Sequence, residues 1–183
     1  MDERSRILEA GTALLTSSPD GTLSVRALCE AAQVSPATVN RHFADMPDLI
    51  SAIVEHAFAS YLASRPAPAT SPDPAQDIRD HWDDHVAFAL GNANVYRSMF
   101  MPGVRAPGAV REMMQRLLLG LLARCADAGL LAMDRNAAAR LILATNTGVA
   151  ISLATQEAHA RDVSWSHEAR DALLDSITAT GSG

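Results

Sequence analysis

The sequence predicts an all-α protein of about nine helices. Ala, Leu and Arg dominate the chain, and runs of β-branched residues are few. Apolar residues recur at intervals of three or four positions, which is the spacing of a helix face, and no segment alternates with the period of a β-strand. These two observations lead to the predicted class.

Composition supports a folded core made of aliphatic side chains. The chain has 183 residues, 48% of them hydrophobic but only 4% aromatic, which suits one medium domain or two small ones. Cys29 and Cys125 form no metal or redox motif, and no secretory signal is visible. No apolar run reaches the length expected of a membrane span. We therefore expect a reduced, cytoplasmic chain with no membrane partner.

The first predicted helix covers residues 3–17. Its inner stripe consists of Ile7, Leu8, Gly11, Leu14 and Leu15. The cluster at 18–21 (Ser-Pro-Asp-Gly) predicts a turn, and Ser24 is the expected N-cap of the next helix.

Residues 24–43 predict two short helices with a tight break between them. Ser35 supplies a capping hydroxyl, and Pro36 falls at the first helical position, where its missing N–H costs nothing. Val39 and Phe43 are four residues apart and can both face inward. A fourth helix, from the cap Asp45 to about residue 62, follows.

The segment 65–74 holds four prolines and is the best domain boundary in the chain. We expect a first domain over 1–62, a linker over 63–73 and a second domain over 74–179. Its helices are predicted at 74–91, from 92 to about 102, and at 108–128, 135–160 and 164–178.

The predicted helix at 135–160, with Asp134 as its cap, is apolar on nearly every side. Ala144 and Gly148 within it would let another helix approach closely. An exposed helix would not have this composition, so we expect it to be covered.

The break within 24–43 allows two interpretations. Small and polar residues at the start of a second short helix suit insertion into the major groove of DNA. An ordinary helical hairpin inside an all-α domain fits these twenty residues equally well.

Over its first sixty residues the chain resembles the TetR family of transcriptional regulators. The resemblance rests on the spacing of motifs over about forty residues, not on any single position. These motifs are Ile7-Leu8-Glu9-Ala10, Leu23-Ser24-Val25-Arg26-Ala27-Leu28, Ala31-Ala32-Gln33-Val34-Ser35, Thr38-Val39-Asn40-Arg41-His42-Phe43 and Asp48-Leu49. The resemblance implies a three-helix DNA-binding head with a helix-turn-helix motif at 24–43. It further implies a helical ligand-binding domain that dimerises through the helices at about 135–160 and 164–178.

Four positions depart from the family pattern. The turn Gly is Gln33, a second Gly is Ala37, the common Tyr is Asn40, and the Lys that touches phosphate is Met46. The first fifty residues also carry four arginines against seven carboxylates, and the whole chain has a net charge of −6. Because phosphate neutralisation supplies most non-specific affinity, we expect that affinity to be weak.

The residues expected to face DNA lie on and beside the second short helix. They are Arg26, Ser35, Ala37, Thr38, Asn40, Arg41 and His42. Arg26 is a candidate phosphate clamp, Ala37 a contact for a thymine methyl, and Arg41 a reader of guanine or a phosphate contact. Ser35 is expected chiefly to cap its helix.

A ligand pocket is expected among the large side chains of the second domain. The candidates are Trp82, Phe88, Tyr96, Phe100, Met113 and Asn146. Met-rich surroundings adapt to apolar ligands, and a buried amide needs a partner, so a largely hydrophobic small molecule is expected. A plain core is the alternative for most of these residues individually.

No metal site, cofactor or catalytic site is expected. Asp77, His81 and His85 recur every four residues. The first and last of them are about 12 Å apart by helix rise, so all three cannot bind one ion. A His81–His85 pair with a distant third ligand is the alternative to a solvated acidic face, which explains these residues better. No catalytic motif is present.

The sequence therefore predicts a cytoplasmic, homodimeric, ligand-responsive repressor that binds a palindromic operator in double-stranded DNA. The first alternative is a helical small-molecule sensor or interaction protein that has lost DNA binding. The second is a small all-α enzyme, which only a bound cofactor or metal would support.

Overall fold

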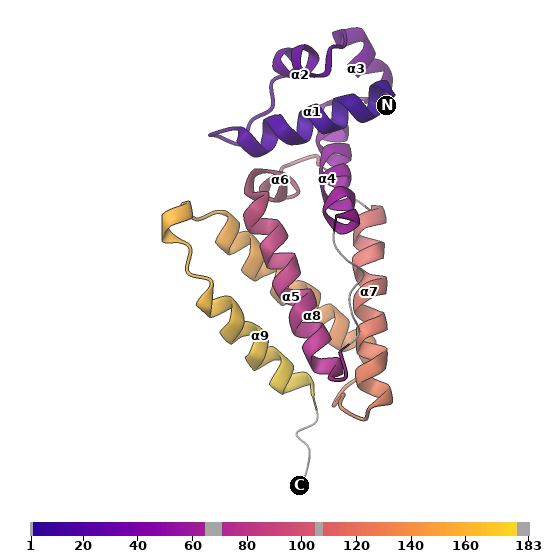
Figure 1. Cartoon of the computed structure of the whole chain (residues 1–183), viewed down its shortest axis with the longest axis vertical. Coiled ribbons are helices and arrows are strands. Elements are labelled where there is room, and N and C mark those ends of the chain that lie inside the picture. Colours follow the sequence, from indigo (N-terminus) through magenta and orange to yellow (C-terminus); the bar gives the residue numbers. More distant parts are fainter. Residues whose placement is uncertain (1, 65–70, 105–107, 179–183) are drawn as a thin grey trace. The chain divides into compact units, whose positions relative to one another are not determined.

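The computed structural model describes residues 2–64, 71–104 and 108–178. Within these ranges the chain forms nine α-helices and one short 3-10 helix, with no β-strand (Figure 1). A single antiparallel bridge joins Leu131 to Thr178. The predicted all-α class is confirmed.

The chain divides into two compact units. The N-terminal unit comprises residues 1–65 and 91–111, and the C-terminal unit comprises residues 66–90 and 112–183. Most of the predicted linker, residues 65–70, lies outside the described residues. The functional domain limits expected from the sequence stay a prediction.

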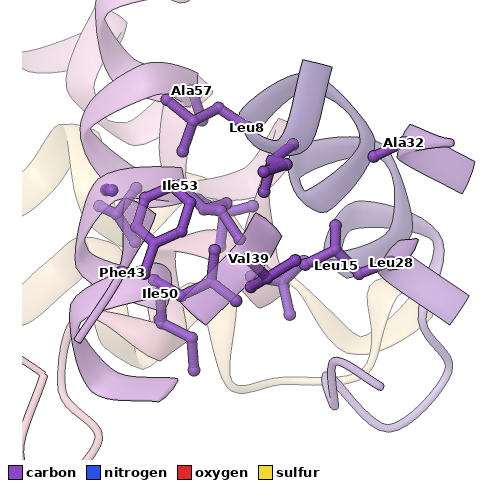
Figure 2. Close-up of a cluster of buried hydrophobic side chains, with 14 of the residues drawn as sticks. Leu8, Leu15, Leu28, Ala32, Val39, Phe43, Ile50, Ile53 and Ala57 are labelled. Atoms are coloured by element: carbon purple, nitrogen blue, oxygen red, sulfur yellow. The ribbon is translucent and has the colours of Figure 1, made fainter. Parts of the chain in front are cut away.

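Four helices and one later segment build the N-terminal unit. They are α1 (Glu3–Ser17), α2 (Val25–Ala32), α3 (Pro36–His42), α4 (Met46–Ala63) and α6 (Ala93–Ser98). Their apolar faces meet in one core, where Leu8, Leu28, Val39 and Ile53 point toward one another (Figure 2). α1 buries Ile7, Leu8, Gly11 and Leu15 of the predicted inner stripe, whereas Leu14 is only half-buried.

The predicted capping residues fix where these helices begin. Ser24 Oγ accepts from the backbone N–H of Ala27, and Asp45 Oδ1 accepts from that of Asp48 at 2.8 Å. These bonds satisfy N–H groups that the first turn of a helix leaves unpaired. The capping predictions are therefore confirmed.

The C-terminal unit is built from α5 (Pro74–Gly91), most of α7 (Gly108–Asp127), α8 (Arg135–Ala154) and α9 (Ser164–Ile177). The α5 side chain Trp82 donates from Nε1 to Ser166 Oγ of α9 at 3.1 Å. Asn146 of α8 donates from Nδ2 to the carbonyl oxygen of Trp82 at 3.3 Å. These two bonds tie α5 to α9 and to α8.

α8 ends earlier than the sequence predicts, at Ala154 instead of about residue 160. The Thr155 hydroxyl bonds the carbonyl oxygens of Ile151 and Ser152, at 2.9 and 3.0 Å. A side-chain hydroxyl that donates to helix carbonyl oxygens competes with the backbone N–H groups that would continue the helix. The chain then continues into the 3-10 turn Ala158–Ala160.

By length and composition alone, α8 could cross a membrane, which differs from the expectation drawn from the sequence. Its buried residues, among them Ile142, Asn146 and Leu153, lie inside the C-terminal unit. A long apolar helix in the core of a protein passes the same test, so this observation is weak evidence for a membrane span.

Candidate nucleic-acid interface

The turn between α2 and α3 sets the direction of α3. Gln33 lies in the left-handed region at φ 54°, and the N–H of Val34 donates to the carbonyl oxygen of Cys29 at 3.0 Å. Together with the bond from Gln33 N–H to Glu30 at 3.4 Å, this is the Schellman arrangement that closes a helix. The family's glycine position is therefore occupied by a residue with a Cβ in a glycine conformation.

Ser35 begins α3 and is committed to capping it. Its Oγ accepts from the backbone N–H of Thr38 at 3.1 Å and lies 3.0 Å from the Thr38 hydroxyl. Pro36 occupies the first helical position. Both side-chain oxygens are thus engaged at the helix start, as expected of a cap.

α3 turns one side inward and the other outward. Val39 and Phe43 are both 4% exposed and form part of the core of the N-terminal unit. Ala37, Asn40 and Arg41 are exposed. The side of α3 away from the core is therefore made of side chains that suit contacts with base edges and phosphates.

The other predicted DNA contacts are either already paired or less exposed to solvent. Arg26 is exposed on α2 and pairs with Glu30 at 3.1 Å. Thr38 and His42 are half-buried, and the rings of His42 and Phe43 lie 6.3 Å apart. Six of the seven predicted residues thus lie from the start to the end of α3, and Arg26 lies apart from them on α2.

Two residues near the start of α1 also contact this region, and neither is among the seven predicted DNA contacts. The guanidinium carbon of Arg4 lies over the Phe43 ring, 5.5 Å from its centroid. Glu3 was not expected to take part, yet it pairs with Arg41. No local pattern connects two residues so far apart along the chain, so sequence reasoning had no signal for this pair.

The turn before α2 carries a strongly acidic carboxyl. Asp20 Oδ1 accepts from the Ser18 hydroxyl at 2.7 Å and from the Thr22 hydroxyl and N–H at 2.8 and 3.1 Å. These donors stabilise the charged form and lower the pKa of Asp20 to about 2. Its negative charge therefore persists at every pH at which the protein would meet DNA.

The predicted pocket residues are divided between the two units. Trp82, Phe88 and Asn146 are buried in the C-terminal unit, with Met113 half-buried there. Tyr96 and Phe100 belong to the N-terminal unit, where their rings lie 5.8 Å apart and Phe100 is 51% exposed. The buried Asn146 Oδ1 has no hydrogen-bond partner among the described residues.

Two hollows within the described residues are lined by side chains other than those six. The larger, of about 420 Å³, lies between α1 and α4 and is lined among others by Thr12, His56 and Tyr61. The smaller, of about 150 Å³, lies between α5 and α9 beside Asp83 and Ser166. The predicted ligand pocket stays a prediction.

On α5, the stripe Asp77, His81 and His85 that the sequence suggested as possible metal ligands includes an acidic residue that already pairs with protein groups. Asp77 is buried, accepts from the N–H of Ser71 at 2.9 Å and forms an ion pair with Arg124 of α7. Burial, with His81 nearby, lowers the pKa of His85 to about 4. Among the described residues, no three His, Cys, Asp or Glu side chains gather as metal ligands.

Residues 7–53 match the family model described as bacterial regulatory proteins, tetR family. This segment is similar to the tetR family. The matched residues run from α1 through the Gln33 turn and α3 into α4, so the tetR-family match covers the helix-turn-helix described above.

Solved structures similar to the whole chain have the same fold. A protein of unknown function from Rhodococcus sp. RHA1 is 23% identical with a TM-score of 0.73, over 98% of this chain and 97% of that one. The TetR family transcriptional regulator PfmR from Thermus thermophilus is 21% identical with a TM-score of 0.64, over 95% and 96%. The regulator FadR from Bacillus subtilis, in complex with stearoyl-CoA, is 13% identical with a TM-score of 0.71, over 94% and 98%.

A comparison with curated protein sequences gives no match. The family model and the solved structures nevertheless agree: the chain has the fold of a tetR-family transcription regulator, a regulatory class of DNA-binding proteins. The tetR-family resemblance stated from the sequence is confirmed.

Proposed function

We propose that the chain is a ligand-responsive repressor that binds a palindromic operator as a homodimer, with residues 1–62 as its DNA-binding domain. The observation that carries this proposal is the outward side of α3. Asn40 and Arg41 are exposed there, behind a capped turn and within a segment that matches the tetR family. A short helix that presents such side chains is suited to the major groove.

The contacts divide by chemistry. Asn40 carries both a donor and an acceptor and can pair with adenine, whereas Ala37 offers a methyl group to thymine. Arg26, already paired with Glu30, would exchange that exposed carboxylate for a phosphate. Ser35, Thr38 and His42 complete the proposed surface, with Ser35 acting through the start of α3.

The proposed dimer interface lies on α8 and α9. Exposed residues recur on α8 at Leu141, Ala144, Gly148 and Ser152, which share one face of the helix. Leu141 is 42% exposed, and a Cβ placed on Gly148 would meet nothing within 4 Å. An apolar stripe of small residues suits close packing against a second copy, and two-fold symmetry would place two reading heads on a palindrome.

The proposed ligand is a largely hydrophobic small molecule bound by the C-terminal unit. Support comes from Asn146, whose buried Oδ1 lacks a partner among the described residues and could accept a hydrogen bond from a ligand. The similar FadR structure from Bacillus subtilis contains stearoyl-CoA, so this compound is a rational first probe. A shift in the melting temperature with stearoyl-CoA, but not with free CoA, would support an acyl-binding sensor.

The decisive experiment selects random duplexes with the purified full-length chain at low salt and then titrates salt on the enriched sequence. We expect a palindrome whose affinity falls steeply as salt rises. The double variant Asn40→Ala/Arg41→Ala should lose footprinting and keep its helicity. Arg116→Ala, which removes an exposed arginine of α7, is the matched control and should bind as the wild type does.

Enrichment of no sequence by a folded dimer would reject this proposal. It would favour instead a helical sensor without DNA binding, which the acidic head and the neutral residues Asn40 and Met46 motivate. Sedimentation of Leu141→Glu, which places a charge on the proposed dimer face, tests the interface separately, and a monomer is the expected result.

A further inference from the structure

A carboxylate from the first helix lies against the reading helix. Glu3, in the first turn of α1, accepts through Oε2 from Nη2 of Arg41 on α3. The same oxygen lies 3.5 Å from Nε2 of His42. One acidic side chain thus faces two consecutive residues of the helix that is proposed to read DNA.

The pair is not needed to hold the fold. The Arg41 and Glu3 side chains are 61% and 44% exposed, and exposed ion pairs contribute little to stability. α1 and α3 are already joined through the core that contains Ile7, Leu8 and Val39. A long-range contact with so small a structural role needs another explanation.

The contact fixes the guanidinium while leaving donors available. Arginine carries five N–H groups in a rigid planar fork, arranged as two edges on which two N–H groups run parallel. A single carboxylate oxygen that accepts from Nη2 leaves at least one of these edges for another acceptor. Bidentate recognition of guanine, through O6 and N7, requires one such edge.

The charge of Glu3 also selects among acceptors. A phosphate that approaches Arg41 would meet a second negative charge beside it, and the two would repel each other. A guanine edge is uncharged and does not suffer this repulsion. The pair of Glu3 and Arg41 therefore favours a base over a phosphate as the partner of Arg41.

We propose that Glu3 is a specificity-determining positioning residue, which orients Arg41 to read a guanine in each half-site. This inference rests on the proposed DNA-binding function and deepens it. It resolves the two roles open to Arg41 in favour of base recognition. It also explains why a DNA-binding domain would carry the acidic side chain of Glu3 beside its recognition helix.

The test compares full-length wild type with Glu3→Gln on three kinds of duplex: the selected operator, its single-base variants and a random sequence. Glu3→Gln should bind the operator about tenfold more weakly. Its preference for guanine should fall from more than tenfold to less than about threefold at one position of each half-site. Binding to the random duplex should stay equal or increase.

Two further variants separate charge from positioning. Glu9→Gln removes an exposed carboxylate from the same helix and should keep the full base preference. Arg41→Lys keeps the positive charge but loses the fork, so it should lose the guanine preference as Glu3→Gln does. Near-normal operator binding by Arg41→Lys would mean that Arg41 meets phosphate, and would overturn the proposal.

The proposal also fails if Glu3→Gln leaves the base profile unchanged, or if Glu3→Gln and Glu9→Gln strengthen binding to all duplexes to the same extent. Glu3 would then be only a surface charge that repels DNA. Failure of the proposed function looks different, because the wild type itself would enrich no duplex, and this result would reject both proposals.

Discussion

The side-chain Nδ2 of Asn94 donates a hydrogen bond of 3.1 Å to the backbone carbonyl oxygen of Leu15. The same nitrogen reaches the carbonyl oxygen of Ser18 at 2.6 Å. The last carbonyls of a helix have no partner within it, and α1 ends in the extended residue Ser18 without a glycine cap. A residue of α6, 79 positions from Leu15, therefore completes the end of α1.

Asn94→Ala should lower the free energy of unfolding of the N-terminal unit by about 1–2 kcal/mol, because two partly buried carbonyls lose their donor. Urea unfolding measures this change, and hydrogen exchange should show faster opening at the end of α1. Asn136→Ala, at an exposed position of α8, is the matched control. Equal stability of the two variants would contradict a capping role.

Gln33→Gly should stabilise the protein by about 0.5–1 kcal/mol. Gln33 is the single non-glycine residue with positive φ in the described part of the chain, and the left-handed conformation costs an L-residue about 1–2 kcal/mol. The greater freedom of glycine in the unfolded chain offsets part of this gain. Gln33→Ala keeps the Cβ and should give no stabilisation in the same urea experiment.

The features that the sequence predicts well are local. Ser24, Ser35 and Asp45 cap their helices through N–H groups three residues away, so composition over a few positions is sufficient to find them. The inward positions of Val39 and Phe43 follow in the same way from helical spacing. The family pattern added the order of the helices and the DNA-binding role.

The features that the sequence does not predict depend on distant contacts. The pairing of Glu3 with Arg41 spans 38 positions, and the bond from Asn94 to Leu15 spans 79. Neither leaves a periodic signal. The association of α6 with the N-terminal unit has the same origin, since its fully buried Val95 resembles any other apolar helical residue until the fold places it in that core.

Stability should depend on pH through His85. Burial and the neighbouring His81 lower its pKa from the usual 6.5 to about 4. Between these values the unfolded chain takes up a proton that the folded chain does not, so stability present above pH 6.5 is lost as the pH falls toward 4. We expect a loss of about 3 kcal/mol through this group by about pH 4.

His85→Gln should flatten this part of the pH profile, measured by urea unfolding at several values between about pH 7 and about pH 4. His159→Gln replaces an exposed histidine of the 3-10 turn and should leave the slope unchanged. If unfolding free energy depends on pH in His85→Gln as steeply as in the wild type, other groups are responsible for the pH dependence.

The ion pair between Asp77 and Arg124 should be costly to break from one side and cheaper to replace as a whole. Asp77 is 8% exposed, and Arg124 also donates to the carbonyl oxygen of Ser71 at 2.6 Å. Arg124→Met leaves a buried carboxylate without its cation and should cost about 3 kcal/mol. The double variant Asp77→Leu/Arg124→Met retains no buried charge at this pair. Its loss of unfolding free energy should therefore be smaller than the summed losses of the two single variants. A double-mutant cycle in urea tests this, and strict additivity would show that the pair does not hold α5 against α7.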